Sequence, residues 1–367
     1  MNYLKKETMH KDENLTRKLD HLQLAKSLTD GPLTTGFEDI RLIHYATSSL
    51  SLQDIDTAFC FGSKRLEMPL LINAITGGPE LSTQINRSLA RVAKELGIGM
   101  AVGSQRLALS NPVLKSSYMI ARKENPHGLI FANLGALCSP DEALQAVEML
   151  EADGLQLHLN LAQELAMAEG DRNFSGIVDS IAAVAEKVPV PVIVKEVGFG
   201  LSAETAQELW QRGIKYMDVG GQGGTNFATI ERYRQGLALP SVFEGWGIPT
   251  AVSIAEVTTR CLPVTVIASG GIRSALEAIK ALSLGADLVG IAGPAVKLLM
   301  DHSEEALLAY FNEFIYDFRS LMILTGSSNL GKLSKLPIII TGKTKDWLEQ
   351  RGIMDHFKQR TLINPQP

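Results

Sequence analysis

Cysteine is scarce in this sequence, and its few cysteines lie far apart. The three are Cys60, Cys138 and Cys261, and no CxxC occurs. So sparse a set cannot build a disulfide framework or, by itself, a zinc site. We therefore expect buried thiols in a reducing compartment.

Long apolar runs and a surplus of basic charge are also absent. Residues 1–17 are polar and charged, without the apolar segment of a signal peptide, and no later apolar run approaches the roughly 18 residues of a membrane span. Lys and Arg number 35 against 40 Asp and Glu, a net charge of −5, which offers no general footprint for nucleic acid. The sequence predicts a cytoplasmic protein with neither a membrane nor nucleic acid as partner, while local basic sites for a small anion remain open.

The composition that is present is that of an ordinary globular protein. Of 367 residues, 45% are hydrophobic and 20% are charged, and this length suits two domains or one large α/β barrel. Between Pro69 and about Pro294, short apolar β-branched runs alternate with helical stretches, which is typical of a parallel sheet with crossover helices. Eight strands are predicted, at residues 70–73, 99–103, 129–133, 155–160, 192–197, 216–220, 264–268 and 288–292.

This alternation favours a (β/α)8 TIM barrel over a doubly wound sheet. An open Rossmann sheet carries G-x-G-x-x-G after its first strand, where this chain has T-G-G-P at residues 76–79. We divide the chain into an N-terminal extension, residues 1–68, and a barrel with C-terminal helices, residues 69–367, in which an apolar helix at 306–324 caps the barrel. Predicted barrel helices include residues 139–151, 174–187, 203–212 and 274–284.

Polar side chains gather at the predicted strand ends, where barrels carry their functional residues. In the fourth strand the two-residue period directs Gln156, His158 and Asn160 toward the lumen. Buried polar groups are unfavourable without partners, so these side chains indicate a polar ligand at the barrel mouth. The alternative is a polar layer whose members satisfy one another, and it stays open above all for Gln156.

Two charged residues near the next strand ends are further candidates. Lys195 points into the lumen from the fifth strand, which suggests an anionic or electron-rich cofactor; an ion pair with Asp218 is the alternative. Glu164 could bind a divalent cation together with phosphate oxygens, or it could be an ordinary charge at a helix start.

Glycine-rich segments follow the last three strands. Residues 269–273 and 290–294 occupy the loops after strands seven and eight, where barrels commonly bind phosphate with backbone N–H groups and a helix N-terminus. Plain turns are the alternative for each pair of glycines. A third segment, residues 220–226, is too rich in glycine for a tight turn alone and indicates a loop adapted to a ligand.

The motifs together resemble the type 2 isopentenyl-diphosphate delta-isomerases, FMN-dependent barrel enzymes, over nearly the whole chain. The resemblance lies in the order and spacing of the motifs, because no single one is specific. Ile75 departs from the family, which often has Met there. The motifs are R-K-L-D-H-L at residues 17–22, A-I-T-G-G at 74–78, V-G-S-Q-R at 102–106, N-L-G at 133–135, H-L-N followed by Q-E within 158–164, K-E at 195–196, G-G-T-N at 223–226, E-G-W-G at 244–247 and S-G-G-I-R at 269–273.

The resemblance implies three groups of contacts. The FMN ring is expected near Ala74, Ile75, Thr76, Ser104, Asn133, Lys195 and Thr225, and its phosphate on Gly270, Gly271, Arg273, Ala292 and Gly293. The allylic diphosphate is expected on Arg17, Lys18, Ser104, Arg106, His158, Asn160 and Gln163, with Glu164 holding Mg²⁺.

The implied reaction converts isopentenyl diphosphate into dimethylallyl diphosphate without net redox change. Moving a proton between carbons of an unactivated alkene needs a strong acid and base beside one apolar chain, a task that the resemblance assigns to reduced FMN, with NADPH as reductant. Among the catalytic residues Gln163, Lys195 and His158, we expect Lys195 to stabilise negative charge on the flavin and Gln163 to position or relay a proton. Family members tend to be homotetramers or larger.

Two other classes remain as alternatives. A flavin oxidoreductase of hydroxy acids needs a His base and an Arg clamp near the sixth strand, and an IMP dehydrogenase-like enzyme needs a cysteine within residues 218–247. The sequence has neither feature there. A flavin- or phosphate-binding module without turnover would require the lumenal polar residues to be purely structural.

Overall fold

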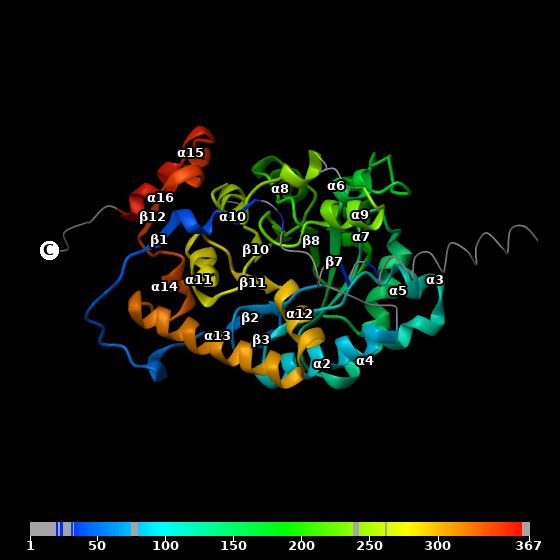
Figure 1. The fold of residues 1–367 in the computed structure, drawn as a ribbon, viewed down its shortest axis with the longest axis horizontal. Coiled ribbons are helices and arrows are strands. Elements are labelled where there is room, and N and C mark those ends of the chain that lie inside the picture. Colours follow the sequence, from blue (N-terminus) through cyan, green and yellow to red (C-terminus); the bar gives the residue numbers. More distant parts are fainter. Residues whose placement is uncertain are drawn as a thin grey trace, which may run out of the picture.

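Eight parallel strands close into a barrel in the computed structural model (Figure 1), which describes residues 20, 23–24, 31, 33–74, 80–237, 242–260 and 263–361. The strands follow one another around the barrel in chain order, and β11 pairs with β4 to close it. Closure confirms the TIM barrel and excludes the doubly wound sheet. The strands are β4 (Leu70–Ile72), β5 (Gly99–Ala101), β6 (Ile130–Gly135), β7 (Gly154–Leu159), β8 (Val192–Glu196), β9 (Tyr216–Asp218), β10 (Thr265–Ser269) and β11 (Leu288–Ile291).

All eight predicted strands are present, and the differences are at their ends. Asn160, expected as the last lumenal residue of the fourth strand, lies one residue beyond β7 and is the residue before helix α6 (Leu161–Ala166). The strand ends there because the chain turns into α6, a short helix at the barrel mouth. The apolar runs reflect burial of parallel strands on both faces.

Several outer helices combine an apolar stripe, which packs on the barrel, with residues that cap the helix N-terminus. In α5 (Pro140–Leu150) a capping box between Ser139 and Glu142 precedes a buried stripe of Ala143, Ala146, Val147 and Leu150. The other outer helices are α2 (Glu80–Leu96), α4 (Ser116–Glu124), α7 (Ile177–Lys187), α8 (Ala203–Gln211), α10 (Thr250–Thr258), α11 (Ala275–Ser283) and α13 (Glu304–Leu324). Helix α13, predicted as a cap at 306–324, packs against α11, α12 (Gly293–Asp301) and α2 in the outer ring.

The extension before the barrel is joined to the C-terminal elements. Strand β1 (Ile40–Leu42) pairs antiparallel with β12 (Ile338–Ile340), and the two lie side by side in Figure 1. The remaining elements are η1 (Phe37–Asp39), η2 (Leu52–Asp54), α3 (Arg106–Ser110), η3 (Pro112–Lys115), α9 (Phe227–Arg234), η4 (Val242–Gly245), α14 (Leu330–Leu333), α15 (Gly342–Gln350) and α16 (Met354–Thr361).

A hairpin of β2 (Phe59–Phe61) and β3 (Lys64–Leu66) closes the end of the barrel opposite the strand C-termini. Phe61 packs against Phe131 and Tyr216, with ring centroids 4.8 Å apart in both pairs. Because side chains alternate along a strand, Cys60 points outward and is exposed, which corrects the expectation that it is buried. Cys138 is buried as expected, and Cys261 lies outside the described residues.

None of the helices in the described ranges is long and apolar enough to cross a membrane.

Candidate active site

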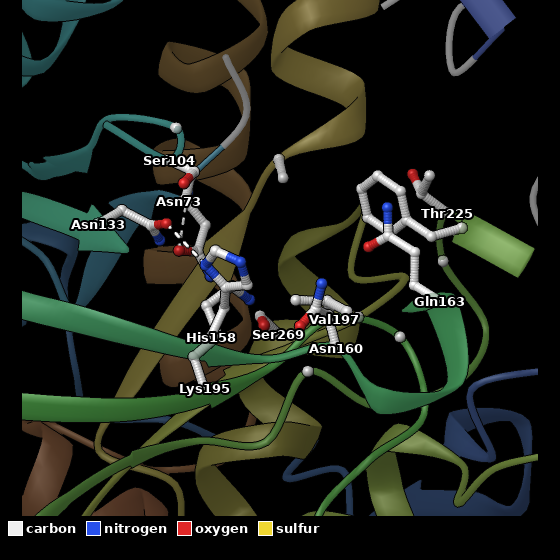
Figure 2. Close-up of a pocket in the computed structure, with 18 of the residues that line it drawn as sticks. Asn73, Ser104, Asn133, His158, Asn160, Gln163, Lys195, Val197, Thr225 and Ser269 are labelled. Carbon is white, nitrogen blue, oxygen red and sulfur yellow. Dashed lines mark hydrogen bonds between the residues drawn. The ribbon is translucent and has the colours of Figure 1, made fainter. Parts of the chain in front are cut away.

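A cavity of about 550 Å³ opens at the C-terminal ends of the barrel strands, a size typical of small-molecule sites. Four of the expected site residues, Arg17, Lys18, Ile75 and Thr76, lie outside the described residues. All the others line this cavity: Ala74, Ser104, Arg106, Asn133, His158, Asn160, Gln163, Glu164, Lys195, Thr225, Gly270, Gly271, Arg273, Ala292 and Gly293. In Figure 2, Asn133 and His158 lie on one side of the cavity and Gln163 and Thr225 on the other.

At the cavity floor, side chains from β6, β7, β9 and the residue after β4 form a buried hydrogen-bonded network. Asn133 Nδ2 donates to Gln156 Oε1 at 3.0 Å, Gln156 Nε2 donates to Asn73 Oδ1 at 2.8 Å, and Asn73 Nδ2 donates to Asp218 Oδ2 at 2.7 Å. His158 Nδ1 lies 3.0 Å from Asn133 Oδ1. Gln156 is therefore part of a self-satisfied polar layer and does not line the cavity, whereas His158 does both.

Lys195 lines the cavity and also forms the ion pair with Asp218 that was the alternative to a cofactor contact. Its Nζ lies 3.3 Å from Asp218 Oδ2 and donates to the Glu196 carbonyl at 3.0 Å. Asp218 also accepts the Ser269 hydroxyl at 2.5 Å. Asp218 thus supplies the counter-charge that lets an ammonium group remain buried at the cavity floor.

Glu196, next to Lys195, shapes the loop after β8. Its carboxylate accepts the backbone N–H groups of Val197 at 2.6 Å, Gly198 at 2.7 Å and Gly200 at 3.2 Å, and also that of Phe199. Burial opposes the charged form and raises the pKa of Glu196 to about 7. The carboxyl group holds in place the loop that contributes Val197 and Gly198 to the cavity wall.

The glycine-rich loops after β10 and β11 form a cradle suited to a phosphate group. Helix α12 begins at Gly293 without a side-chain cap, and Ala292 and Gly293 line the cavity. Its first turn therefore offers backbone N–H groups there that no side chain caps, except at Pro294, which has no N–H. Helix α11 is different because Ser274 and Glu277 form a capping box at its start. The N-terminus of α12 is thus the one of these two that offers backbone donors to an anion.

Arg273 joins two of these loops. Its Nη1 donates to the Gly271 carbonyl at 2.5 Å and its Nη2 to the Gly223 carbonyl at 2.9 Å. The Tyr310 hydroxyl on α13 donates to the Arg273 carbonyl at 2.8 Å. Arg273 therefore holds the loops after β9 and β10 together, in addition to lining the cavity.

At the rim, Glu164 is held by two donors from its own segment. Asn160 Nδ2 donates to Glu164 Oε1 at 2.7 Å, and the Asp171 N–H donates to Oε2 at 2.9 Å. Glu164 also lies in the first turn of α6, where an acidic residue at a helix start was the alternative, and its binding of a divalent cation stays a prediction. No group of three or more His, Cys, Asp or Glu that could hold a metal occurs within the part of the chain that the structure describes.

Gln163 contacts a residue that sequence reasoning missed. Its Nε2 donates to Glu231 Oε1 at 3.3 Å, and Glu231 is fully buried and bound by Arg234 Nε at 2.8 Å. Glu231 lies on α9, 68 positions along the chain, where nothing local marks it. Asn73 was also missed, although a polar residue ending the first strand was a usable signal.

Arg106, expected at the diphosphate, is exposed and forms an ion pair with Glu142, with Nη1 2.8 Å from Oε1. Glu142 is also the capping-box residue of α5. The ion pair holds Arg106 at the cavity rim.

Comparison with solved structures relates the fold to flavin enzymes. A mandelate oxidase variant with a monooxide FMN adduct superposes with a TM-score of 0.63 at 17% identity, over 88% of this chain and 92% of that one. Mandelate oxidase itself superposes with a TM-score of 0.59 over 88% and 90%. Likeness at this identity concerns the fold alone.

Comparison with curated sequences identifies the family. Residues 134–339 match the family model of FMN-dependent dehydrogenases. The isopentenyl-diphosphate delta-isomerase of Moorella thermoacetica is 49% identical over 91% of this chain and 96% of its own length, and that of a Geobacillus species is 46% identical over 92% and 96%. A Staphylococcus aureus enzyme of the same name is 40% identical over 93% and 97%. The chain thus belongs to the isopentenyl-diphosphate delta-isomerase family.

Proposed function

We propose that this protein interconverts isopentenyl diphosphate and dimethylallyl diphosphate, with reduced FMN as acid–base cofactor and Mg²⁺ bound with the diphosphate, as a step in isoprenoid precursor biosynthesis. The observation that carries the proposal is that every described residue expected from the family resemblance lines one cavity. A cytoplasmic location and a homo-oligomer, tetrameric or larger, remain part of the proposal.

The cavity has groups suited to both the phosphate and the ring of FMN. The uncapped start of α12 and the backbone of Gly270 and Gly271 form a cradle for the phosphate. Lys195, Asn133 and Ser104 lie at the floor, where they would hold the ring edge by charge and hydrogen bonds. Bound in its reduced form, after reduction by NADPH, FMN would supply acid–base chemistry at its N5 region.

The cavity rim offers a carboxylate that could bind Mg²⁺. Mg²⁺ typically binds one or two carboxylates together with substrate phosphates and water. Glu164 offers one carboxylate at the cavity rim, oriented by Asn160 and the Asp171 N–H. Such a site takes the cation together with the diphosphate rather than holding it alone.

Several rim residues would bind the diphosphate. Arg106 pairs with Glu142 at the surface, and exposed pairs of this kind contribute only about 0–1 kcal/mol. A diphosphate can therefore replace Glu142 as the partner of Arg106 with little loss. His158 and Asn160 would add hydrogen bonds beside the same group.

Arg17 and Lys18 precede Gly31, which contacts the cavity wall. The Gly31 N–H donates to the Gly224 carbonyl at the cavity wall, at 3.1 Å. Arg17 and Lys18 lie outside the described residues, 14 and 13 positions before Gly31. That they bind the diphosphate, in the cavity of their own subunit or of a neighbouring one, is part of the proposal.

Gln163 is suited to positioning the substrate or relaying a proton, rather than to acting as the main base. Its side chain is a neutral amide, and Glu231 accepts a hydrogen bond from Nε2. This contact orients the amide at the cavity wall. A Gln163→Glu variant that keeps the full isomerisation rate would argue against a role for the neutral amide.

Hydroxy-acid oxidation fits the cavity less well. In the segment from the end of β9 to the start of α9, residues 219–227, the residues that line the cavity are Gly220, Gly221, Gly224, Thr225 and Phe227, and none is a histidine or an arginine. The His base and Arg clamp of a hydroxy-acid oxidase were expected in this segment. No observation in the cavity favours this second activity.

The test is anaerobic proton NMR of the purified protein with FMN, NADPH, Mg²⁺ and isopentenyl diphosphate. We expect the methyl signals of dimethylallyl diphosphate to appear, dependent on flavin and reductant but without stoichiometric consumption of NADPH. Bound and reduced FMN without conversion would overturn the substrate assignment.

A further inference from the structure

We propose that Asn73, Gln156 and Asp218 are positioning residues that hold His158 in one tautomer, with its proton on Nδ1, through a one-way chain of hydrogen bonds across the barrel floor. The chain joins the residue after β4, the middle of β6 and β7, and the last residue of β9. Asn73, Asn133 and His158 appear together in Figure 2.

The members of the chain are shielded from water. Asn73, Asn133, Gln156 and Asp218 are each at most 2% exposed. Every side-chain donor and acceptor must therefore find its partner within the protein, since an unpaired buried polar group costs about 1–3 kcal/mol. Orientation at one link then dictates orientation at the next.

The direction of the chain is set at Asn73 by two independent contacts. The Ala74 N–H can only donate, and it lies 2.8 Å from Asn73 Oδ1, which identifies that atom as the oxygen. The Asp218 carboxylate can only accept, and it lies 2.7 Å from Asn73 Nδ2. Both contacts require the same orientation of the Asn73 amide.

The remaining links follow from the Asn73 orientation. Gln156 must donate to Asn73 Oδ1, so its own oxygen faces Asn133, and Asn133 must donate to that oxygen. Asn133 Oδ1 is thus left to face His158 Nδ1, and an amide oxygen only accepts. His158 Nδ1 must carry the proton, and any change in the ring's protonation takes place at Nε2.

The consequence for ligand binding rests on the proposed function, in which His158 contacts the diphosphate. When Nδ1–H of the His158 ring points inward, Nε2 is the ring nitrogen that can gain or lose a proton, and it lies beside Gly135 at the cavity wall. Asp218, at the far end of the chain, is also the counter-ion of Lys195. One buried carboxylate thereby orients the residue expected at the diphosphate and the residue expected at the flavin.

The test is ¹⁵N magic-angle-spinning NMR of the FMN-loaded protein with ¹⁵N-labelled histidine, which distinguishes Nδ1–H from Nε2–H rings. The His158→Asn variant identifies the His158 signals by their loss. We expect wild-type His158 to be protonated on Nδ1. An Nε2–H ring would overturn the proposal without any further variant.

A matched pair of substitutions tests the chain itself. Gln156→Leu removes the acceptor of Asn133, so the Asn133 amide can reverse and the His158 signals should divide between both tautomers. Gln156→Glu keeps an oxygen facing Asn133, whether ionised or protonated, so the Nδ1–H signal should persist. Identical spectra for the two variants would overturn the role of the chain.

Kinetics separates this proposal from the proposed function. In an active isomerase, Gln156→Leu should raise the KM for isopentenyl diphosphate by about tenfold or more, as residues that orient a binding group typically do, and by more than Gln156→Glu. Equal KM values in the two variants would overturn the positioning role. Absence of isomerisation in the wild-type protein would overturn the proposed function and leave the tautomer result standing.

Discussion

Lys195 and Asp218 show how two charged residues can share a barrel floor. Each charge alone would lose several kcal/mol of solvation on burial, and each is stabilised there by the other at 3.3 Å. The Ser269 hydroxyl and Asn73 amide satisfy the remaining capacity of the carboxylate. The pair keeps a positive charge beside the position expected for the flavin.

Replacing Lys195 should therefore lower both stability and cofactor affinity. In Lys195→Met the Asp218 carboxylate stays buried without its cation, and we expect the free energy of unfolding to fall by about 3–5 kcal/mol. Chemical denaturation and FMN titration measure the two effects. The control is Arg212→Met, which removes the exposed pair with Asp179 and should lower stability by under about 1 kcal/mol; equal losses would contradict the role assigned to burial.

Glu196 should make stability depend on pH. Its pKa is raised to about 7 in the folded protein by burial, so the folded state favours the protonated form. The stabilisation is present below the pKa of the unfolded chain, near 4.5, and is lost as pH rises through about 7, by at most about 3 kcal/mol. Glu196→Gln should flatten this part of the curve in urea denaturation at a series of pH values, and an unchanged slope would contradict the prediction.

Helix α12 illustrates how an element end becomes a binding site. Its first turn has no side-chain cap, whereas α11 beside it is closed by Ser274 and Glu277. Open N–H groups favour an anion there. The close approach of Gly271 to Gly223 brings two loops together at the same place.

Gly271→Ala should disrupt this cradle. Gly271 has φ +75°, and a Cβ there would lie 2.4 Å from the Gly223 carbonyl oxygen, so the loops must separate. We expect FMN affinity to fall at least about tenfold, a loss of about 1.4 kcal/mol, in a flavin titration. Gly213→Ala is the matched control, because Gly213 has φ +85° with nothing within 4 Å of its Cβ; it carries only the backbone strain of about 1 kcal/mol. Equal FMN affinities in the two variants would count against the cradle.

On the scale of the whole molecule, the extension before the barrel is joined to the C-terminal elements. The β1–β12 pairing, the Gly31–Gly224 hydrogen bond and the bond from Thr344 Oγ1 to the Gly36 carbonyl, at 3.2 Å, attach the extension to the barrel and to the C-terminal helices. The Gly31–Gly224 contact places Gly31 at the cavity wall, because Gly224 lines the cavity. That Arg17 and Lys18, which precede Gly31 in the chain, contact the diphosphate stays a prediction.

A double variant, Arg17→Ala with Lys18→Ala, should raise the KM for isopentenyl diphosphate by about a hundredfold or more, since each of the two lost charge-assisted contacts is worth about 1.5–3 kcal/mol. FMN affinity and melting temperature should not change. Steady-state kinetics and flavin titration provide the measurements. Lys5→Ala with Lys6→Ala makes the same change of net charge in the same segment, and an equal rise in KM there would refute a specific contact.

The sequence alone determined the strand order, the type of barrel and most cavity residues, because these depend on local patterns. Parallel strands buried on both faces leave continuous apolar runs, and the polar residues or glycines that end them mark the functional edge. The eight strands, His158, Asn160, Lys195 and the glycine-rich loops after β10 and β11 were predictable in this way, whereas Ala74, Ser104, Arg106 and Asn133 were expected from the family resemblance. Arg17, Lys18, Ile75 and Thr76 stay predictions.

Only the tertiary structure decided which polar groups touch. The Gln163–Glu231 contact, the Arg273 bridge between loops and the choice of Asp218 as partner of both Lys195 and Asn73 join positions 23 to 145 residues apart. Strand alternation predicts the face on which a side chain lies, but not its rotamer or its partner. Those depend on barrel closure and register, which bring distant side chains within hydrogen-bond distance and make each satisfy the donors and acceptors of the next.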